Sequence, residues 1–391
     1  MKYKNARNVL PDELIEMIQE YVQGEYVYIP IRDKSITEIS TEYKTELEKR
    51  NMHIYTKYLE GLSNKRLAEI YNLSESSIRR IIIKQRKGYA SMTEKIKEIL
   101  NSWNLENSEI KQIYDTTWQI EDKYVLKCYS DFEMLERNIM INTTLDEMNI
   151  PVGRVISTVD GKQYALCDNS YWFLSEKLNG SNVLKIGNDK AYAYKMGEII
   201  AELHIAFKSC ENKAVFWNNS FLDEMNGWVK ENFERNGWKC ISKDEYEAII
   251  SELTGIYDAL PVQLIHRDVH FGNFLFNGKD FSGYIDFDLS QRNIRVFDLC
   301  YFLLGLLSEK EKFEITNDIW LDLVGCVFES YNKKVSLVEE EKQAVVLVME
   351  CIELLFVSYF ESVDDTVCAE GAYNIYKFVN QNKERIIKSI S

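Results

Sequence analysis

The stretch HRDVHFGNFLF, residues 266–276, carries the polar side chains that decide the fold of this 391-residue chain. Asn273 follows Asp268 by five residues, and the later stretch YIDFD places Asp286 18 residues after Asp268. Two short β-like runs, near 274–276 and 283–285, lie between them and predict a small hairpin. Such a hairpin would bring Asn273 and Asp286 together, and both offer the hard oxygen ligands that suit Mg²⁺.

The same stretch fits the pattern H-R-D-x-x-x-x-N, which forms the catalytic loop of protein kinases. Phosphoryl transfer needs a metal ion on the phosphates, a carboxylate at the attacking hydroxyl and positive charge near the α/β-phosphates. We therefore assign Asp268 to orient the hydroxyl or accept its proton, and Asn273 and Asp286 to hold Mg²⁺. A single loop Asp is more often a turn or cap, but here several residues agree in type and spacing.

The segments HRDVHFGNFLF, GYIDFD and FDLCYF together resemble the aminoglycoside phosphotransferase and choline kinase superfamily of small-molecule kinases. The likeness covers about residues 93–391. Its D-x-H-x-G-N core differs from protein kinases, which lack the His and Gly. It implies ATP and Mg²⁺ as cofactors and a small-molecule hydroxyl as acceptor. It also implies an α+β, bilobal, protein-kinase-like fold, with a small β-rich N-lobe at about 91–178 and a large helical C-lobe at about 179–391.

The resemblance also implies an ATP site. Lys127, in the strand YVLK, matches the lysine that contacts the ATP phosphates. Its partner on the following helix would be Glu136, with Glu133 as the alternative.

The stretch FLSEKL at residues 173–178 resembles the hinge that binds adenine through backbone groups, which adds Glu176 and Leu178 to the ATP site. Asp298 matches a carboxylate at a helix start that supports the catalytic loop, so we expect a structural role for it.

The chain departs from the family at the turn that covers the phosphates. This turn lies near residues 114–118 and has no Gly, so close backbone approach is harder. Thr116 and Thr117 could offer hydroxyl and N–H groups instead. Arg267 stands where the small-molecule branch most often has Gly.

Other polar residues near the motif have open roles. Asp288 would be either a substrate or second metal contact, or a solvated carboxylate. His270 lies near enough in sequence to touch phosphate, although a structural role is the simpler interpretation. His204 and His266 are expected to be packed side chains rather than acids or bases.

The head of the chain has the pattern of a helix-turn-helix over residues 64–83. Ser63 and Ser74 are placed to cap the two helices. Ala68 is small enough for close helix packing, and Asn72 stands at the turn, where positive φ is tolerated. The apolar residues expected to form the shared core are Leu67, Tyr71, Leu73, Ile78 and Ile81.

The second helix of this pattern carries a basic face. Residues 65–87 hold seven basic and two acidic side chains, a net charge of +5. Recognition helices place short polar and Arg side chains near base edges and cations near phosphates. The residues that we assign to DNA are Ser76, Ser77, Arg79, Arg80, Lys84 and Lys87. A helical hairpin with a solvated basic face is the alternative.

The segments NVLPDEL, GEYVYIPI and LSNKRLAEIYNLSESSIRRII resemble the phage middle-operon regulator (Mor-type) transcription activators over about residues 3–88. In that family an N-terminal helix and strand build a dimer, and the helix-turn-helix binds DNA. The resemblance implies duplex DNA as a partner through residues 64–87 and a homodimer through the N-terminal domain. We place the joint at residues 88–92, which divides the chain into domains 1–90 and 91–391.

Charge and composition agree with two modules. The chain has 47 basic and 62 acidic residues, a net charge of −15. The first 100 residues hold 18 basic and 15 acidic residues, and the rest hold 29 and 47, so the net charges are +3 and −18. The acidic body favours an amine-bearing acceptor. We find no uncharged apolar run of 18 residues, no signal peptide and no C-x-x-C pair, which predicts a cytoplasmic protein without a membrane span.

The sequence therefore predicts an ATP- and Mg²⁺-dependent phosphotransferase joined to a DNA-binding head. Its acceptor would be the hydroxyl of an amino alcohol, amino acid, sugar or aminoglycoside. The alternative is a transcription regulator whose kinase-like domain is a non-catalytic ligand sensor. The Gly-free turn favours the sensor, whereas the complete set of Lys127, Asp268, Asn273 and Asp286 favours the enzyme.

Overall fold

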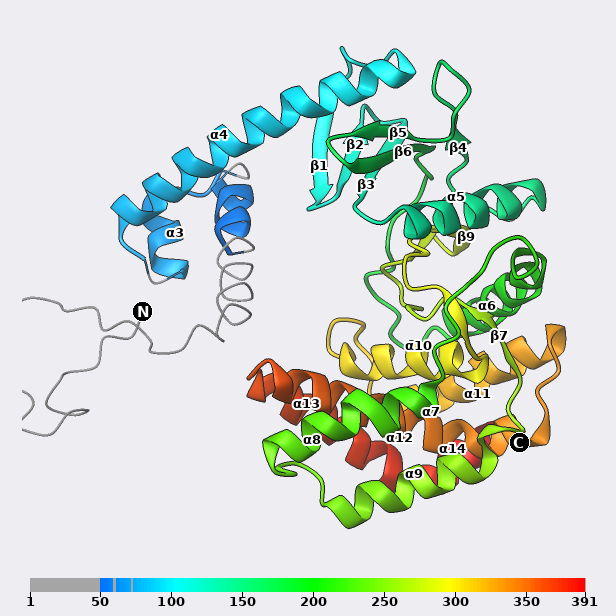
Figure 1. The fold of residues 1–391 in the computed structure, drawn as a ribbon. Helices are drawn as coiled ribbons and strands as arrows, with labels where there is room; N and C mark the ends of the chain where they lie inside the picture. The colour runs from blue at the N-terminus through cyan, green and yellow to red at the C-terminus, as the bar shows by residue number, and fades with distance from the viewer. Residues whose placement is uncertain (1–49, 59–60, 72, 391) are drawn as a thin grey trace, which may run out of the picture. The chain divides into compact units, whose positions relative to one another are not determined.

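The structure is a computed structural model that describes residues 50–58, 61–71 and 73–390 (Figure 1). The helix and strand expected at the N-terminus, and the dimer interface expected there, lie outside these residues, as does Asn72. The side chains of 86–91, including Lys87, are likewise not described. The chain divides into two compact units, residues 1–94 and 95–391, and each is considered by itself.

The described part of the first unit is helical. The helix α3 (Asn64–Ile70) begins at Ser63, whose side chain accepts a hydrogen bond from the Arg66 N–H. The helix α4 (Glu75–Leu100) begins after Ser74, whose hydroxyl accepts from the Ser77 N–H at 3.1 Å. Both predicted caps are confirmed. Leu67 and Ile78 are fully buried, and they pack with the buried Ile54, Tyr55 and Ile82, which the sequence pattern did not identify.

The expected joint at residues 88–92 is not a break in the secondary structure. It lies inside α4, which continues to Leu100, and the two compact units meet between Glu94 and Lys95. A single Gly in a helix costs only about 1 kcal/mol relative to Ala. The buried Ile96 and Leu100 on the last turns of α4 belong to the core of the second unit, so the helix is stabilised on both sides of Gly88.

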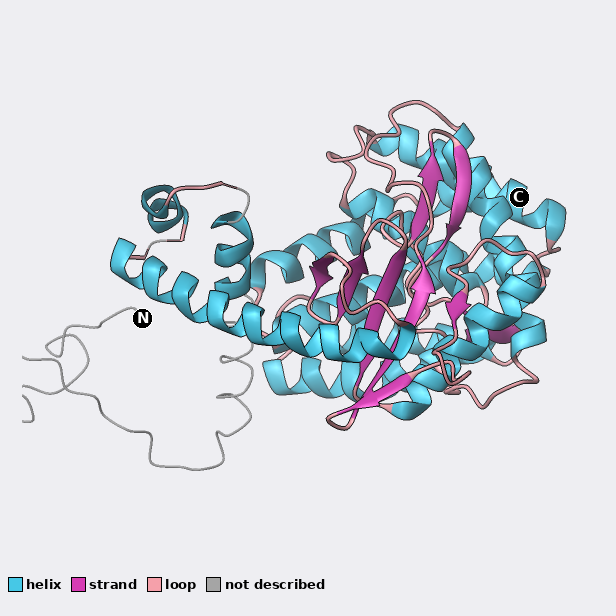
Figure 2. Cartoon of the chain, turned by 90° about the horizontal axis from the view of Figure 1, so that it is seen from above, coloured by secondary structure: helices cyan, strands magenta, loops and turns pink. Residues whose placement is uncertain are grey.

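The N-lobe of the second unit is an antiparallel sheet in the order β1-β2-β3-β6-β4, with β5 also paired to β6. Figure 2 shows the strands in magenta, running side by side. The strands are β1 (Ile110–Tyr114), β2 (Thr117–Ile120), β3 (Tyr124–Tyr129), β4 (Val155–Ile156), β5 (Ala165–Cys167) and β6 (Ser170–Glu176). The expected pairing around the turn at 121–122 is confirmed, because β2 pairs with β3 in register.

The two faces of this sheet alternate residue by residue, as strands require. Trp118, Leu126 and Trp172 point to the face that packs against the end of α4 and Trp103. The opposite face holds Tyr129 and Phe173 and packs against α5 (Phe132–Glu147). Because Lys127 alternates with Leu126, it lies on the α5 face of the sheet.

The C-lobe is a helical assembly below the sheet in Figure 1. Its helices are α6 (Ala191–Cys210), α7 (Phe221–Glu224), α8 (Lys230–Asn236), α9 (Lys243–Tyr257), α10 (Val296–Ser308), α11 (Asn317–Lys334), α12 (Glu339–Ser362), α13 (Thr366–Gln381) and α14 (Lys383–Ile390). Their apolar faces enclose one continuous core.

Within the described ranges, α12 is the one helix long and apolar enough to cross a membrane by length and composition. Two thirds of its apolar window, 67%, is buried inside the C-lobe, where core helices of soluble proteins meet the same criterion. The helix accordingly packs as an element of the C-lobe core.

Two short antiparallel pairs of strands complete the C-lobe. The strand β7 (Val262–Ile265) pairs with β10 (Gln291–Ile294), and β8 (Phe274–Asn277) pairs with β9 (Asp280–Tyr284). The second pair is the hairpin that the sequence predicted between Asn273 and Asp286. The loop 266–273 leaves β7 and enters β8, so both pairs position it.

Candidate active site

Asp268 is the centre of a hydrogen-bond network in loop 266–273. Its carboxylate accepts from the Asn273 side-chain amide at 2.9 Å and from the Tyr301 hydroxyl at 3.0 Å. His270 Nε2 lies 3.4 Å from the same carboxylate. Burial acts to raise the pKa of Asp268, but the hydrogen bond and charge of His270, with smaller contributions from His266 and Tyr301, lower it to about 2.

Asp298, at the start of α10, holds the backbone of this loop. Its carboxylate accepts hydrogen bonds from the N–H groups of His266 at 2.8 Å and Arg267 at 2.9 Å. The expected structural role of Asp298 is confirmed by these contacts. His204 Nε2 lies 3.0 Å from Asp298 and His204 Nδ1 lies 2.9 Å from the Tyr331 hydroxyl, so His204 is a satisfied core residue, as predicted.

His266 is fully buried and holds the loop from inside. Its Nε2 lies 3.3 Å from the Ile285 carbonyl, and its Nδ1 accepts from the Asp268 N–H at 3.4 Å. Burial lowers the pKa of His266, and the surrounding carboxylates only partly oppose that effect. The imidazole is therefore a packing residue, which confirms the expectation.

Arg267 has φ of 71°, the left-handed region that favours Gly. This explains why Gly is common at this position in the small-molecule branch. In this chain two contacts hold the Arg267 side chain. It donates to Glu224 at 2.5 Å, and its guanidinium lies 3.9 Å from the centre of the Phe297 ring.

His270 and Gly272 fit together as a unit. The Gly272 N–H donates to His270 Nδ1 at 2.9 Å, which folds the imidazole over the Gly272 backbone. A Cβ on Gly272 would meet His270 Cε1 at 2.3 Å, closer than real Cβ contacts. The His-x-Gly spacing is thus a steric requirement of the loop.

The β8–β9 hairpin brings the two expected metal ligands together. The Ile285 N–H donates to the Asn273 carbonyl at 3.0 Å, which places Asn273 beside the residue preceding Asp286. Asn273 gives its amide N–H to Asp268, so its side-chain oxygen is the atom available to a cation. In the described ranges no cluster of three His, Cys, Asp or Glu side chains is arranged as a metal site. An amide, one or two carboxylates and nucleotide phosphates form the donor set that Mg²⁺ accepts in such sites.

Lys127 pairs across the two lobes with Asp286. The ammonium lies 2.9 Å from Asp286 and 3.8 Å from Asp288. Burial acts to raise the pKa of Asp286, but the charge and hydrogen bond of Lys127, with smaller contributions from His266 and Asp288, together lower it. The sequence assigned Lys127 to the phosphates and Asp286 to the metal. The structure places these two side chains in direct contact.

The expected partner of Lys127 on α5 is not found. In the part of the chain that the structure describes, neither Glu136 nor Glu133 contacts Lys127. Both glutamates are exposed, and Glu133 lies 3.9 Å from Arg137 instead. The physical reason is the phase of the helix: the positions of α5 that turn inward are Leu135, Asn138 and Ile139.

Asp288 is held at the same place by a residue that the sequence analysis missed. The Tyr129 hydroxyl donates to the Asp288 carboxylate at 2.7 Å. Burial raises the pKa of Asp288, Lys127 opposes that rise, and the nearby Asp286 adds to it. No sequence signal connects Tyr129 to Asp288, because 159 residues separate them.

The phosphate-covering turn is shorter than expected. Tyr114 pairs with Thr117 in the sheet, so only Asp115 and Thr116 form the turn. Thr117 belongs to β2 rather than to the turn, and it stands opposite Lys127 in register. Neighbouring positions in register share a face of the sheet, so the Thr117 and Lys127 side chains lie side by side.

Some hydrogen-bonding groups of the hinge after β6 already have partners within the protein. The Glu176 N–H donates to the Arg154 carbonyl at 2.8 Å, and the Glu176 side chain forms an ion pair with Arg154. The Leu178 backbone N–H and carbonyl have no partner among the described residues. The free hydrogen-bonding groups of the hinge are therefore at Leu178 rather than at the Glu176 N–H.

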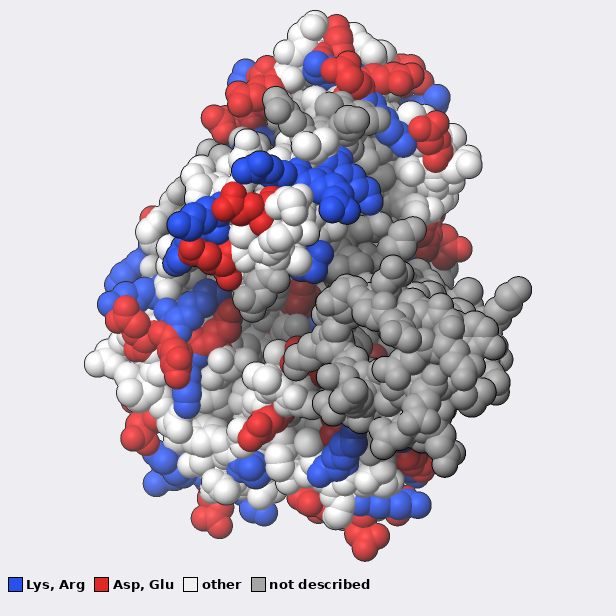
Figure 3. Space-filling view, turned by 90° about the vertical axis from the view of Figure 1, so that its left-hand side faces the viewer, with Lys and Arg blue, Asp and Glu red and all other residues white. Residues whose placement is uncertain are grey.

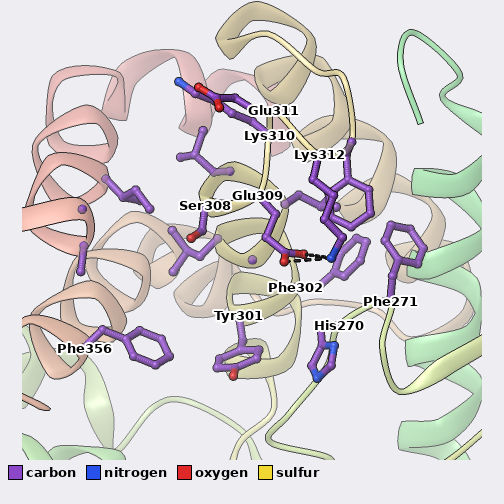
Figure 4. Close-up of a pocket in the computed structure, with 18 of the residues that line it drawn as sticks. His270, Phe271, Tyr301, Phe302, Ser308, Glu309, Lys310, Glu311, Lys312 and Phe356 are labelled. Carbon is purple, nitrogen blue, oxygen red and sulfur yellow. Dashed lines mark hydrogen bonds and ion pairs between the residues drawn. The ribbon is translucent and has the colours of Figure 1, made fainter. Parts of the chain in front are cut away.

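A cavity of about 1180 Å³ opens beside loop 266–273. Figure 4 shows His270 and Tyr301 at one end of it and Lys310 and Glu311 at the other. The walls come from α10, α12, α13 and the segment after α10, and Tyr114 from the N-lobe reaches it. Tyr301, which touches both Asp268 and the cavity, was not identified from the sequence, because nothing in its local pattern separates it from the apolar run of α10.

The residues assigned to DNA form the exposed side of α4. Ser76, Arg79, Arg80 and Lys84 are exposed, and Arg79 lies 3.4 Å from Glu75. Ser76 and Ser77 hydroxyls lie 2.8 and 2.9 Å from that of Ser74. The side chain of the sixth assigned residue, Lys87, lies outside the described set.

The comparisons with known proteins agree with the geometry of the second unit. Residues 108–315 match the model of the family described as "Phosphotransferase enzyme family". The chain therefore belongs to this family of phosphotransferase enzymes.

Solved structures show the same fold at low sequence identity. An amicoumacin kinase has a TM-score of 0.55 at 14% identity, covering 73% of this chain and 93% of its own. An aminoglycoside phosphotransferase from Alicyclobacillus acidocaldarius has a TM-score of 0.54 at 12% identity, covering 75% and 94%. A choline/ethanolamine kinase family protein from Mesorhizobium loti has a TM-score of 0.51 at 13% identity, covering 76% and 99%.

One curated relative is similar to a smaller part of the chain. The uncharacterized protein YraL of Bacillus subtilis is 33% identical over 84 residues, which are 21% of this chain and 97% of YraL.

Proposed function

We propose that the second unit transfers the γ-phosphate of ATP to a hydroxyl of a small molecule, with Mg²⁺ as cofactor. The observation that carries the proposal is Asp268, which is ionised, anchored at both carboxylate oxygens and hydrogen-bonded to Tyr301, a residue that lines a large cavity. A carboxylate held in this way can orient an attacking hydroxyl and accept its proton. Amino alcohols, amino acids, sugars and aminoglycosides are the acceptor classes.

The remaining site residues would bind the nucleotide and the metal ion. Lys127 would neutralise the nucleotide phosphates, and the Leu178 backbone groups would hold the adenine. Asn273 and Asp286 would hold Mg²⁺. Asp288 would offer a second carboxylate, to a second metal ion or to the substrate. The metal would offset the charge that develops on the phosphates. Positioning by the Thr117, Lys127 and loop 266–273 framework would supply most of the remaining rate enhancement.

The competing proposal is a ligand sensor without catalysis. The two-residue turn at Asp115–Thr116 favours the sensor. The turn has no Gly, and without Gly the backbone cannot easily close over the phosphates. Against it stand Lys127, Asp268, Asn273 and Asp286, whose joint arrangement a sensor does not require. Purified full-length protein incubated with ATP and Mg²⁺ against a panel of acceptors separates the two. Transfer to any hydroxyl supports the enzyme, and ligand binding without turnover supports the sensor.

We further propose that the first unit is a helix-turn-helix that binds duplex DNA through α4, in a cytoplasmic protein that dimerises through its N-terminal segment. The exposed Arg79, Arg80 and Lys84 on one helix support the proposal, as does the buried Leu67 and Ile78 core that holds α3 against α4. A phosphotransferase unit on the same chain would then couple a small molecule to transcription. A gel-shift titration with the full-length protein tests the DNA half of the proposal.

A further inference from the structure

Glu353 is a buried carboxylate without a partner in the wall of the cavity. It lies on α12, is 3% exposed, and has no hydrogen bond or ion pair in the described residues. Burial raises its pKa to about 8, and no neighbouring charge or hydrogen bond contributes to that rise. A carboxylate in such surroundings costs folding free energy, so its position requires an explanation beyond packing.

The cavity connects Glu353 with the carboxylate proposed for catalysis. Phe356, one turn further along α12, contacts the Tyr301 ring, with the two ring centres 6.1 Å apart. The Tyr301 hydroxyl donates to Asp268. Glu353 and Tyr301 thus line the same cavity, and Tyr301 links that cavity to Asp268.

The other Asp, Glu, Lys and Arg side chains that line the cavity sum to no net charge. The segment after α10 brings two acidic and two basic side chains to the cavity, and Glu309 and Lys312 pair at 2.7 Å. Much of the remaining wall of the cavity is apolar, with Phe302, Phe356 and Phe360 among its residues. Figure 3 shows blue and red side chains interspersed on the face that it draws.

We propose that the acceptor is an alcohol with one primary or secondary ammonium group and an apolar body, and that Glu353 binds the ammonium. This inference rests on the proposed phosphotransfer and specifies its substrate. A carboxylate without a protein donor requires N–H groups from the ligand, and charge-assisted hydrogen bonds are about twice as strong as neutral ones. A single buried carboxylate satisfies one ammonium. Glu309 and Glu311 also line this cavity, and Glu309 is paired with Lys312, so a polycation finds fewer free carboxylates than it has ammonium groups.

The test uses the full-length protein with ATP, Mg²⁺ and a matched set of acceptors. Aminohexanol is the monoamine, hexanediol its neutral isostere, N-trimethyl aminohexanol its quaternary analogue and kanamycin the polycation. The variant is Glu353→Gln, which keeps shape and removes charge. The matched control is Glu350→Gln, because Glu350 lies on the same helix and is 6% exposed but accepts a hydrogen bond from Asn380 and lines a different cavity of about 460 Å³.

We expect aminohexanol to have the highest kcat/KM of the set. Glu353→Gln should lower that value roughly 10- to 100-fold, mainly through KM, since a hydrogen bond to a charged group is lost. Hexanediol should be unaffected by the variant, and Glu350→Gln should change neither. Equal loss for aminohexanol and hexanediol, no loss for aminohexanol, or a preference for kanamycin or the quaternary analogue would overturn the inference. Thermal unfolding of both variants shows whether either is misfolded.

Calorimetric binding of aminohexanol without ATP separates this inference from the proposed function. In one outcome wild type binds aminohexanol, Glu353→Gln weakens this binding, and no acceptor is phosphorylated. That outcome rejects the proposed enzyme but supports the ammonium site. Phosphorylation of other acceptors, without calorimetric binding of aminohexanol, keeps the enzyme and rejects the ammonium site.

Discussion

Tyr301 donates a hydrogen bond of 3.0 Å to the Asp268 carboxylate. Tyr301 lies three residues after Asp298 on α10, so both project from the same face of that helix. Asp298 holds the backbone N–H groups of loop 266–273, and Tyr301 holds the side chain that the loop presents. One helix therefore fixes both the position of the loop and the orientation of Asp268.

Asp268→Ala is expected to reduce turnover about 10²- to 10⁴-fold, the usual contribution of a positioned base. Nucleotide should still bind, because Asp268 is not expected to contact ATP. Tyr301→Phe should lower turnover less, since the carboxylate stays but loses one orienting donor. Rate assays on the best acceptor, with nucleotide binding measured in parallel, check both. The exposed Asp258→Ala serves as control, and full activity in Asp268→Ala would reject the assignment.

Lys127→Ala and Asp286→Ala test the contact between the lobes. We expect both to weaken nucleotide binding in the presence of Mg²⁺, Lys127→Ala through lost charge at the phosphates and Asp286→Ala through a lost metal ligand. In the absence of metal, only Lys127→Ala should weaken nucleotide binding. Equilibrium titrations with a fluorescent ATP analogue, with and without Mg²⁺, measure this difference. The opposite metal dependence would exchange the two assigned roles.

Gly272→Ala should destabilise the protein by roughly 1–3 kcal/mol, because the new methyl group would press on the His270 ring. Removal of the ring should relieve that contact. We therefore expect Gly272→Ala to cost less in a His270→Ala background, which a double-mutant cycle of urea unfolding quantifies. Strictly additive effects would mean that Gly272 is required for another reason.

Glu353 should make stability depend on pH. Burial raises its pKa from the ordinary 4.5 to about 8, so the native state holds the proton more tightly than the unfolded chain. This contribution to stability is complete below pH 4.5 and is lost as pH rises through about 8. Glu353→Gln has no such loss, so its stability relative to wild type should increase across this range, with an upper limit of roughly 5 kcal/mol. Unfolding of both proteins at several pH values, without ligand, measures the difference, and a constant difference would contradict the assigned environment.

DNA binding by α4 should weaken steeply with salt. Each phosphate neutralised by Arg79, Arg80 or Lys84 contributes a slope of roughly −0.9 in the log–log plot of affinity against salt. Replacing any of these residues by Ala should reduce the slope, whereas the exposed Lys239→Ala in the second unit should leave it unchanged. A larger loss at a preferred site than on random DNA would mark a base contact. Absence of binding by the full-length protein at low salt would remove DNA from its function.

The sequence alone determined the parts of the site that depend on short spacings. Asn273 and Asp286 meet because a hairpin of fewer than twenty residues joins them, and Ser63 and Ser74 cap helices through contacts within one turn. In both cases the relevant energy is local, so the residue types carried enough information. Asp298 was instead identified through the family resemblance, because it binds backbone N–H groups 32 and 31 residues earlier in the chain.

Only the tertiary structure decided which distant side chains meet. Lys127 pairs with Asp286 rather than Glu136, because the phase of α5 turns Glu136 to solvent while the β8–β9 hairpin carries Asp286 to the sheet. The helix α4 continues past Gly88 because its last turns pack on the N-lobe core. Glu353 and Tyr301 reach one cavity through the packing of α10 against α12, and such packing is set by the shapes of whole helix faces, which no local pattern in the sequence records.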